Sequence, residues 1–300
     1  MPQQPPLAPQ EERAIETVLQ GWVLQAIAQS RKDFGKWVFH GGTALKKAFS
    51  SSRYSEDLDF MVEPTLDTVR LMEKVCAHLQ TLVALTYGPT ATLKLKARTS
   101  ERNPQVYLLT LHAPELAMSS VKVKVEFSPT ENLAAYIKTS VVATPDHAIV
   151  RNKVAHAPAV RVEVGDLNQL YLDKWVALTM RQEIKHRDVW DLSWLLDNRD
   201  LRPLNPTDIW EGMQTLVSRF YPKNDVSAQW YSQANQRANE LNTPQYTRRF
   251  MDDMQRWLPP DLASMPASHF QERIDRVLAL FEPLVACMKD TYGQAPTTTH

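Results

Sequence analysis

The sequence has few of the residues that build disulfide frameworks or zinc sites. Cys76 and Cys287 are the only cysteines among 300 residues, and neither lies near a second metal-type ligand in the chain. The eight histidines are scattered without paired spacing. A disulfide scaffold and a Cys-x-x-Cys zinc site are therefore excluded.

An excess of charge of one sign is also missing. The 34 Lys and Arg residues balance 34 Asp and Glu residues, so the formal net charge is zero at pH 7. Bulk charge therefore gives no support to nucleic-acid binding, and any RNA contact has to come from local basic patches. Three candidates are residues 94–98, Lys122 with Lys124, and residues 185–187. Such a patch is more often a solvated face.

Long apolar runs are absent as well. No run reaches the length of a membrane helix, and the first residues lack a signal-peptide core. With 43% hydrophobic and 23% charged residues, the chain can bury one or two substantial cores. We expect an ordinary soluble enzyme of the reducing cytoplasm.

Residues 41–60 carry the most informative pattern, GGTALKKAFSSSRYSEDLDF. Asp57 and Asp59 alternate with Leu58 and Phe60, which predicts a strand with both carboxylates on one face. Two anions held this close usually have a cation between or in front of them. Oxygen ligands with open positions favour Mg²⁺ or Mn²⁺. The alternative is a solvated strand edge with two surface acids.

A glycine turn precedes this strand. Residues 37–39 form a short apolar run that ends at Gly41-Gly42-Thr43, and helical spacing follows. Glycines let backbone amides approach a ligand, Thr43 can cap the helix and contact phosphate, and the helix N-terminus carries partial positive charge. The turn therefore suits a triphosphate. A plain turn with an N-cap is the alternative.

Arg53 and Ser55 stand at alternate positions before the two aspartates. All four side chains could then lie along one face of the strand and its lead-in. The fork of Arg53 suits phosphate oxygens, and Ser55 offers a small donor beside the metal. Alternatively, Arg53 pairs with Glu56 or Asp57 at the surface.

A third acid is expected on another strand, because metal-dependent phosphoryl transfer needs a further ligand or base. Residues 121–127 alternate valines with polar residues, which is typical of a half-buried strand. Glu126 ends the polar row after Lys122 and Lys124, and is the candidate. The alternative is that Glu126 pairs with these lysines or lies exposed.

These motifs resemble the nucleotidyltransferase-fold toxins of the AbiEii/AbiGii type. Such toxins are the toxin half of type IV toxin–antitoxin pairs and are related to DNA polymerase β-like transferases. The resemblance covers residues 37 to about 195 and departs from the family pattern at Glu126, where aspartate is more usual. It rests on the Gly-Gly-Thr turn, an R-x-S-x-D-L-D-F strand and a later helical motif, which here are Gly41-Gly42-Thr43, Arg53 to Phe60, and Lys174, Arg181 and Arg187-Asp188.

The resemblance implies transfer of a nucleotide from an NTP to an acceptor hydroxyl, with release of pyrophosphate and with Mg²⁺ or Mn²⁺ as cofactor. Asp57 and Asp59 would hold the metal, and Glu126 would bind it or take the acceptor's proton. The expected triphosphate-binding residues are Gly41, Gly42, Thr43, Arg53 and Ser55, with Lys174, Arg181, Arg187 and Asp188 from the helical motif. Lys174 and Arg181 lie two helical turns apart, so both could face the site. For Asp188 a structural role at a helix start is equally open.

Partners also follow from the resemblance. In some members of the family the acceptor is the 3′ end of tRNA, and the cognate antitoxin carries a winged-helix DNA-binding domain but need not touch the toxin. Two other functions stay open: nucleotide binding without turnover that acts through a partner, and transfer to a protein hydroxyl. A phosphate on Ser55 would place negative charge beside Asp57 and Asp59, which makes Ser55 a hypothetical switch.

The predicted fold class is α+β. A polymerase β-like nucleotidyltransferase domain with a mixed sheet is expected at residues 11–165, followed by a helical domain at 166–292. Residues 1–10 are expected to be disordered, and residues 293–300 to form a polar tail. Within the first domain the periodicity predicts helices at 11–30 and 66–82, and strands at 91–98, 105–112 and 120–127.

Overall fold

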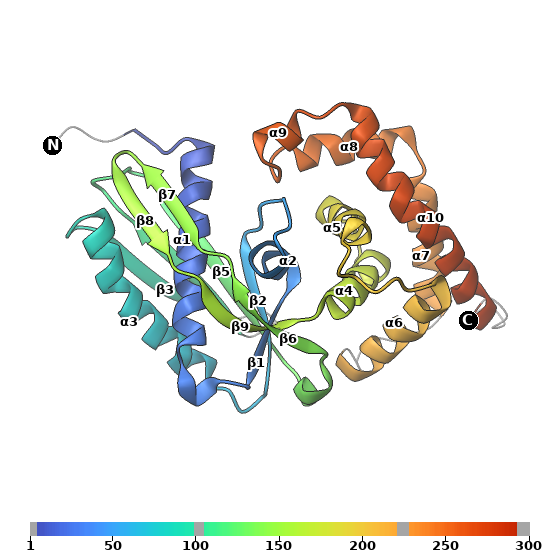
Figure 1. Ribbon diagram of the computed structural model, residues 1–300, viewed down its shortest axis with the longest axis horizontal. Helices are drawn as coiled ribbons and strands as arrows, with labels where there is room; N and C mark the ends of the chain where they lie inside the picture. The colour runs from blue at the N-terminus through green and yellow to red at the C-terminus, as the bar shows by residue number, and fades with distance from the viewer. Residues whose placement is uncertain (1–4, 99–104, 221–227, 293–300) are drawn as a thin grey trace. The chain divides into compact units, whose positions relative to one another are not determined.

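The computed structural model describes residues 5–98, 105–220 and 228–292 (Figure 1). Its contacts divide the chain into two compact units. The first comprises Met1–Ser50 and Ser55–Gly165, and the second comprises Ser51–Tyr54 and Asp166–His300. A mixed sheet in the first unit and helices in the second confirm the predicted α+β class. The short segment Ser51–Tyr54, which sequence periodicity would leave with its neighbours, belongs to the helical unit.

The first unit is built on a seven-stranded sheet with the order β3-β4-β5-β2-β1-β9-β6. Strand β2 pairs antiparallel with β1 on one side and parallel with β5 on the other. Strands β3, β4 and β5 pair antiparallel with one another. The strands of this sheet are β1 (Trp37–His40), β2 (Asp57–Val62), β3 (Thr92–Arg98), β4 (Val106–His112), β5 (Ser120–Pro129), β6 (Lys138–Ala143) and β9 (Val160–Gly165).

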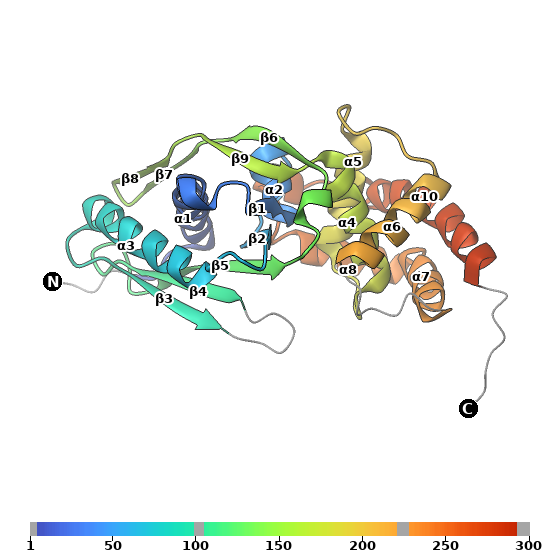
Figure 2. The ribbon, with the colours of Figure 1, turned by 90° about the horizontal axis from the view of Figure 1, so that it is seen from below.

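Two long helices fill one side of this sheet, and a shorter helix packs on its central strands. Helix α1 (Pro9–Ala28) lies between β5 and the strands β7 to β9, while α3 (Thr68–Tyr87) packs on β3 (Figure 2). Alternate residues of β4 and β5 are buried, and the hydroxyls of Tyr107 and Thr68 lie 2.9 Å apart, which shows which face α3 covers. Helix α2 (Gly41–Phe49) contacts β1 and β2.

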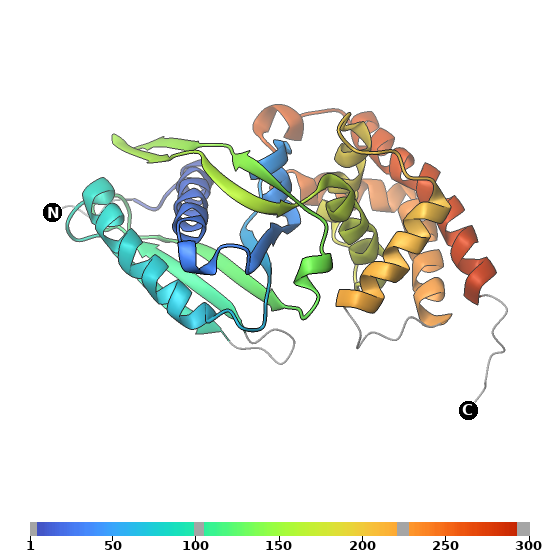
Figure 3. The same ribbon diagram turned by 60° about the horizontal axis from the view of Figure 1, so that its bottom comes forward.

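A separate hairpin, β7 (Asp146–Val150) with β8 (Lys153–Ala157), runs beside α1 (Figure 3). Gly21 of α1 permits this approach, because a Cβ there would lie 2.6 Å from the Cβ of Ala157. The buried ammonium of Lys47 in α2 lies 2.5 Å from the Asp146 carboxylate and also donates to the carbonyl of Thr17. Burial lowers the pKa of Lys47 against the opposing pull of Asp146, so this pair ties the hairpin to both helices.

The sequence did not predict the strands between residues 138 and 165, where short polar and apolar stretches alternate around prolines. The disorder predicted for residues 1–10 is wrong for residues 5–10. Helix α1 begins at Pro9, and the guanidinium of Arg151 donates to the carbonyls of Pro5 and Pro6. Arg151 therefore holds this segment against the turn between β7 and β8. Residues 1–4 and the predicted polar tail lie outside the described residues.

The second unit is helical. Its longest helix, α10, contacts α5, α6, α7 and α8, so these helices share one core. None of the helices in the described ranges combines the length and apolarity needed to span a membrane. The helices of this unit are α4 (Leu167–Met180), α5 (His186–Asp197), α6 (Pro206–Phe220), α7 (Ala228–Leu241), α8 (Pro244–Met254), α9 (Pro260–Ala263) and α10 (Ala267–Tyr292).

Candidate functional site

Three carboxylates lie on adjacent strands of the first unit. Strand β2 begins at Asp57, and its parallel register with β5 places Asp59 opposite Glu126 and Asp57 opposite Lys124. Paired residues of neighbouring strands point to the same face of a sheet. All three acids are partly exposed, whereas the residues between them are buried. The sequence-predicted acids therefore share one face.

The glycine turn lies directly against one of these acids. Gly41 has φ +78°, a left-handed value that favours glycine, and a Cβ at this position would lie 2.5 Å from Oδ2 of Asp59. Strand β1 ends at His40, which is paired with Asp59 and serves as N-cap of α2, although its side chain makes no capping hydrogen bond. The amides of Gly41 and Gly42 thus begin a helix that no side chain caps.

Thr43 has a different role from the one predicted. It lies within the first turn of α2 and does not cap the helix. Its side chain is fully buried, and its hydroxyl donates to the backbone carbonyl of Asp57. The prediction that Thr43 caps the helix is wrong, because the helix already begins at Gly41. Thr43 instead fixes the start of β2 against α2.

A lysine lies between two of the acids. The ammonium of Lys124 is 2.9 Å from the Asp57 carboxylate and 2.6 Å from that of Glu126. Burial disfavours the charge of Lys124, but the hydrogen bonds that its ammonium donates to Glu126 and Asp57 outweigh burial and raise the pKa of the ammonium. Across the described residues, no three His, Cys, Asp or Glu side chains form a ready-made metal cluster. The Lys124 ammonium supplies the positive charge between Asp57 and Glu126.

Arg53 does not lie on the face of β2. It precedes the strand, within the segment Ser51–Tyr54 of the helical unit, and is only 2% exposed. Its guanidinium forms a fork on Asp191 of α5, with both N···O distances 2.6 Å, and donates to the carbonyl of Tyr54. The expectation that Arg53 shares the strand face with Ser55, Asp57 and Asp59 is wrong. The Arg53 side chain points instead toward the buried carboxylate of Asp191 on α5.

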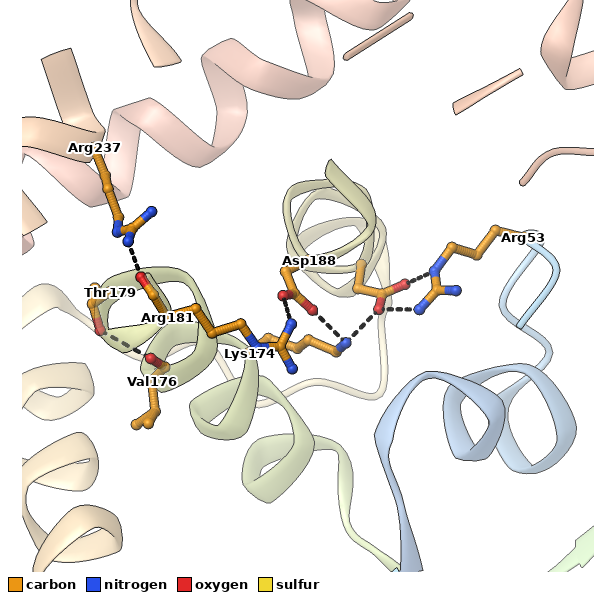
Figure 4. A network of polar contacts seen from close by, with 8 residues as sticks. Arg53, Lys174, Val176, Thr179, Arg181, Asp188 and Arg237 are labelled. Atoms are coloured by element: carbon orange, nitrogen blue, oxygen red, sulfur yellow. Dashed lines mark hydrogen bonds and ion pairs between the residues drawn. The ribbon is translucent and has the colours of Figure 1, made fainter. Parts of the chain in front are cut away.

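Arg53 belongs to a buried ion network in the helical unit (Figure 4). The ammonium of Lys174 on α4 lies 2.7 Å from Asp191 and 2.8 Å from Asp188, so it bridges the two carboxylates of α5. Arg181, at the end of α4, pairs with the second oxygen of Asp188. Lys174 and Arg181 do share a face, as their spacing predicted. Three cations therefore surround two buried acids.

The protonation of this network is set by its cations. Burial of Asp188 pushes the pKa of its carboxyl upward, but Lys174 and Arg181 outweigh that effect and hold the pKa below its ordinary value. The side chain of Arg181 is 43% exposed, in contrast to the buried Lys174. Arg181 is therefore the member of the network with the largest face toward solvent.

The remaining predicted residues stand nearby on α5. Arg187 stacks over the ring of Trp257, with its guanidinium carbon 4.0 Å from the ring centroid. Asp188 lies in the first turn of α5 and forms ion pairs there. These pairs give it the structural role that the sequence left open. Asp191, the second acid of the network, was not among the site residues predicted from the sequence. Its spacing of three residues from Asp188 was the available signal, because such residues share a helix face.

The helical unit also contains a polar pocket of about 540 Å³ beside the end of α4. Its lining includes His186, Arg237, Tyr246 and Arg249. Arg237 is 6% exposed and donates to the carbonyl of Arg181, while its Nε meets no hydrogen-bond partner among the described residues. The pocket therefore presents hydrogen-bond donors next to the ion network.

Residues 22–279 match the family described as nucleotidyl transferase AbiEii toxin, type IV TA system. The chain belongs to this family. The match covers both the acid cluster and the ion network, so the AbiEii resemblance seen in the motifs is confirmed. The comparison with curated proteins found no match.

Solved structures show the same fold at low sequence identity. MenT4, a nucleotidyltransferase toxin from Mycobacterium tuberculosis H37Rv, is 16% identical with a TM-score of 0.53, over 94% of this chain and 90% of its own. A candidate nucleotidyltransferase from H. pylori is 13% identical with a TM-score of 0.51, over 94% of this chain and 99% of its own. At these identities the likeness of this AbiEii member extends to the fold alone.

Proposed function

We propose that this AbiEii-family protein transfers a nucleotide from an NTP to a hydroxyl of RNA, with the 3′ end of tRNA as the acceptor, and releases pyrophosphate. Membership of the family supports nucleotidyl transfer and a nucleotide substrate. The single observation that carries the reaction is the register of β2 and β5. It sets Asp59 opposite Glu126, beside the Gly41 turn.

The donor set fits a hard divalent cation. Asp57, Asp59 and Glu126 offer only oxygens, on neighbouring positions of two paired strands. We propose that Asp57 and Asp59 hold Mg²⁺ or Mn²⁺, with Glu126 as the third ligand or as the base. When bound, the ion would supply Lewis-acid stabilisation of the phosphates. Lys124 would leave its bridging position as the carboxylates take up the ion.

The chain's own groups account for the other parts of the reaction. The amides of Gly41 and Gly42, at the positive end of α2, bind the triphosphate. The acceptor oxygen forms a bond to the α-phosphorus while the bond from that phosphorus to the bridging oxygen breaks, and pyrophosphate carries away the electron pair. Glu126 accepts the proton of the attacking hydroxyl.

Cations of the helical unit supply charge for the leaving group in this proposal. The network of Lys174, Arg181 and Arg53 carries one more cation than its two aspartates neutralise. Lys174 and Arg181 are the members that we assign to charge compensation. Arg53 and Asp188 act as positioning residues, because both are buried and already paired.

The test uses an NTP labelled in its α-phosphate, Mg²⁺ and total RNA. Wild type should place label in RNA, and Asp57→Ala should lower that incorporation by a factor of about a thousand or more, since it removes a proposed ligand. Glu131→Gln is the matched control, because it removes an exposed carboxylate outside the acid cluster. NTP binding with no incorporation into RNA, unaffected by Asp57→Ala, would refute the proposal. Label that runs with protein bands would assign the chemistry to a protein acceptor.

A second candidate is a module that binds nucleotide without turnover and acts through a partner. The bridging position of Lys124 favours it, because an ammonium that satisfies Asp57 and Glu126 competes with a metal for the same oxygens. Lys124→Met separates the candidates. Under the transferase proposal it lowers the Mg²⁺ concentration needed for transfer, while under the binding proposal no Mg²⁺ concentration gives transfer by either protein.

The proposed function includes regulation of the toxin by an antitoxin and by phosphorylation. A type IV toxin family implies an antitoxin as functional partner. We propose that this antitoxin carries a winged-helix DNA-binding domain and that phosphorylation of Ser55 blocks the site. Ser55 lies in the lead-in to β2, where its carbonyl accepts from the amide of Gln20. Ser55→Asp should lose toxicity while Ser55→Ala keeps it, and full toxicity of the aspartate variant would count against the switch.

A further inference from the structure

Two basic patches that are separate in the sequence meet on one face of the sheet. The registers of β2, β5, β4 and β3 define rows of neighbours that cross these strands. One row joins Asp57, Lys124, Leu108 and Lys96. The next two rows are Asp59, Glu126, Val106 and Arg98, and Lys122, Thr110 and Lys94. We call this face, from β2 to β3, the acid–lysine face.

This face points away from the helices that cover the sheet. Tyr107 and its neighbours of odd number on β4 are turned toward α3, where Tyr107 meets Thr68. Side chains of even number therefore point the other way. Lys94, Lys96 and Lys122 are all exposed there.

Charge on this face is divided by position. The acids lie on β2 and at the adjoining end of β5, while β3 presents only cations at its charged positions. The face has five cations and three carboxylates, whereas the whole chain has equal numbers. A metal bound at the carboxylates would raise the local positive charge further. The face therefore complements a polyanion that ends at the acids.

The position of the glycine turn indicates the side from which the polyanion approaches the acids. Gly41 lies on the β1 side of Asp59, and Glu126 lies on the β5 side. Attacking and leaving oxygens stand roughly in line in phosphoryl transfer. With the triphosphate at the N-terminus of α2, the acceptor must come from the β5 side. From β2 to β3 the face extends about 14 Å, or three strand spacings.

We propose that the acid–lysine face is the track for the acceptor, on which the single strand next to the acceptor hydroxyl crosses β5 and β4 and rests its phosphates on Lys122, Lys94 and Lys96. This inference rests on the proposed function for its choice of RNA. Within the described residues of these four strands, no Phe, Tyr or Trp lies on this face. Contacts are therefore mainly with the backbone and tolerate any base, because the face offers no Phe, Tyr or Trp ring for base stacking.

The experiment measures binding of a fluorescein-labelled single-stranded RNA 12-mer to the full chain at several salt concentrations. The test variant is the triple substitution Lys94→Ala, Lys96→Ala and Lys122→Ala. The control removes three exposed cations near the opposite face, by Lys32→Ala, Arg70→Ala and Lys74→Ala. Thermal unfolding and NTP affinity without RNA are measured for both variants, and we expect neither to change, since all six side chains are exposed.

The track predicts that the test variant loses affinity for the 12-mer by a factor on the order of 100 at 0.1 M salt, with the salt slope of log K smaller by about 2. Its KM for RNA rises while its KM for NTP does not. The control variant binds as wild type does. Oligo(U) and oligo(A) 12-mers bind wild type equally.

Equal losses in the two variants, or no loss in the test variant, would overturn the track. So would a wild-type protein that fails to bind the 12-mer. Failure of the proposed function is a separate observation: the 12-mer binds and depends on the three lysines, but no label enters RNA. The binding assay requires no transfer, so the two failures are distinguishable.

Discussion

At the scale of single residues, we expect the sharpest effect from replacing Gly41 by alanine, which adds only a methyl group. Gly41→Ala forces alanine to φ +78° and places its Cβ against the Asp59 carboxylate. We expect the free energy of unfolding to fall by about 1–3 kcal/mol and nucleotide transfer to fall by a factor of about a hundred, because Asp59 must move. Urea unfolding and the labelled-NTP assay measure the two effects.

Gly35 provides the matched control. Its φ is +85°, so Gly35→Ala has similar backbone strain, but a Cβ there meets nothing within 4 Å. We expect a comparable loss of stability with transfer intact. Equal activity of the two variants would show that contact with Asp59 does not matter.

At the scale of elements, helix α1 makes the fold sensitive to pH through Glu16. Burial, aided by the nearby charge of Glu56, raises the pKa of Glu16 to about 8. The folded protein therefore binds the Glu16 proton more tightly than the unfolded chain does. The stabilising contribution is full below pH 4.5, the ordinary value, and is lost as the pH rises toward 8.

Glu16→Gln removes this titration. We expect the variant to be more stable than wild type at pH 8, by about 2 kcal/mol, and equal to it near pH 4.5. Urea unfolding at several pH values measures the difference. Glu73→Gln, which removes an exposed carboxylate of α3 that does not act on Glu16, should leave the pH dependence unchanged. A wild-type stability that rises between pH 5 and 8, with no change in Glu16→Gln, would contradict the assignment.

The ion network joins α4, α5 and the segment Ser51–Tyr54, and its members are not equivalent. Asp191→Ala leaves Arg53 without its carboxylate and removes one partner of Lys174. We expect Asp191→Ala to lower the free energy of unfolding by about 3–5 kcal/mol, because it removes the carboxylate that pairs with buried positive charge. Arg53→Ala should be milder, since Asp191 keeps Lys174. Urea unfolding of both variants tests the order, and a larger loss for Arg53→Ala would contradict it.

At the scale of the whole molecule, we expect metal removal to stop transfer without unfolding the protein. Lys124 already supplies a cation to Asp57 and Glu126, so the metal-free acids are not left as unpaired anions. Treatment with EDTA should abolish incorporation of label and shift the Tm by less than about 2 °C, which corresponds to about 1 kcal/mol. A large fall in Tm would mean that a metal is part of the folded structure.

The sequence predicted those parts of the site that depend on short spacings. Asp57 and Asp59 share a face because strand geometry requires it, and Lys174 and Arg181 both reach Asp188 because helix geometry allows it. The placement of Arg53 could not be predicted in this way. It depends on a partner 138 residues away, and no local period encodes that contact.

Strand pairing could be predicted only in part, because it also depends on contacts between residues that are far apart in the sequence. The alternation in β3, β4 and β5 is long and regular, whereas β6 to β9 are short strands of 5 or 6 residues. The bridge from Lys124 to Glu126 was one of the alternatives that the polar row left open. Register with β2, which the sequence does not contain, is what joins that bridge to Asp57.

The segment Ser51–Tyr54 has a consequence for how proteins of this kind can be recombined. A cut after Gly165 would carry off the helices but leave Arg53 behind, inside the other fragment. The severed helices would then have Asp191 without the guanidinium that holds it on two sides. An exchange of helical units between relatives would therefore succeed only if the donor and recipient agree at residue 53 as well.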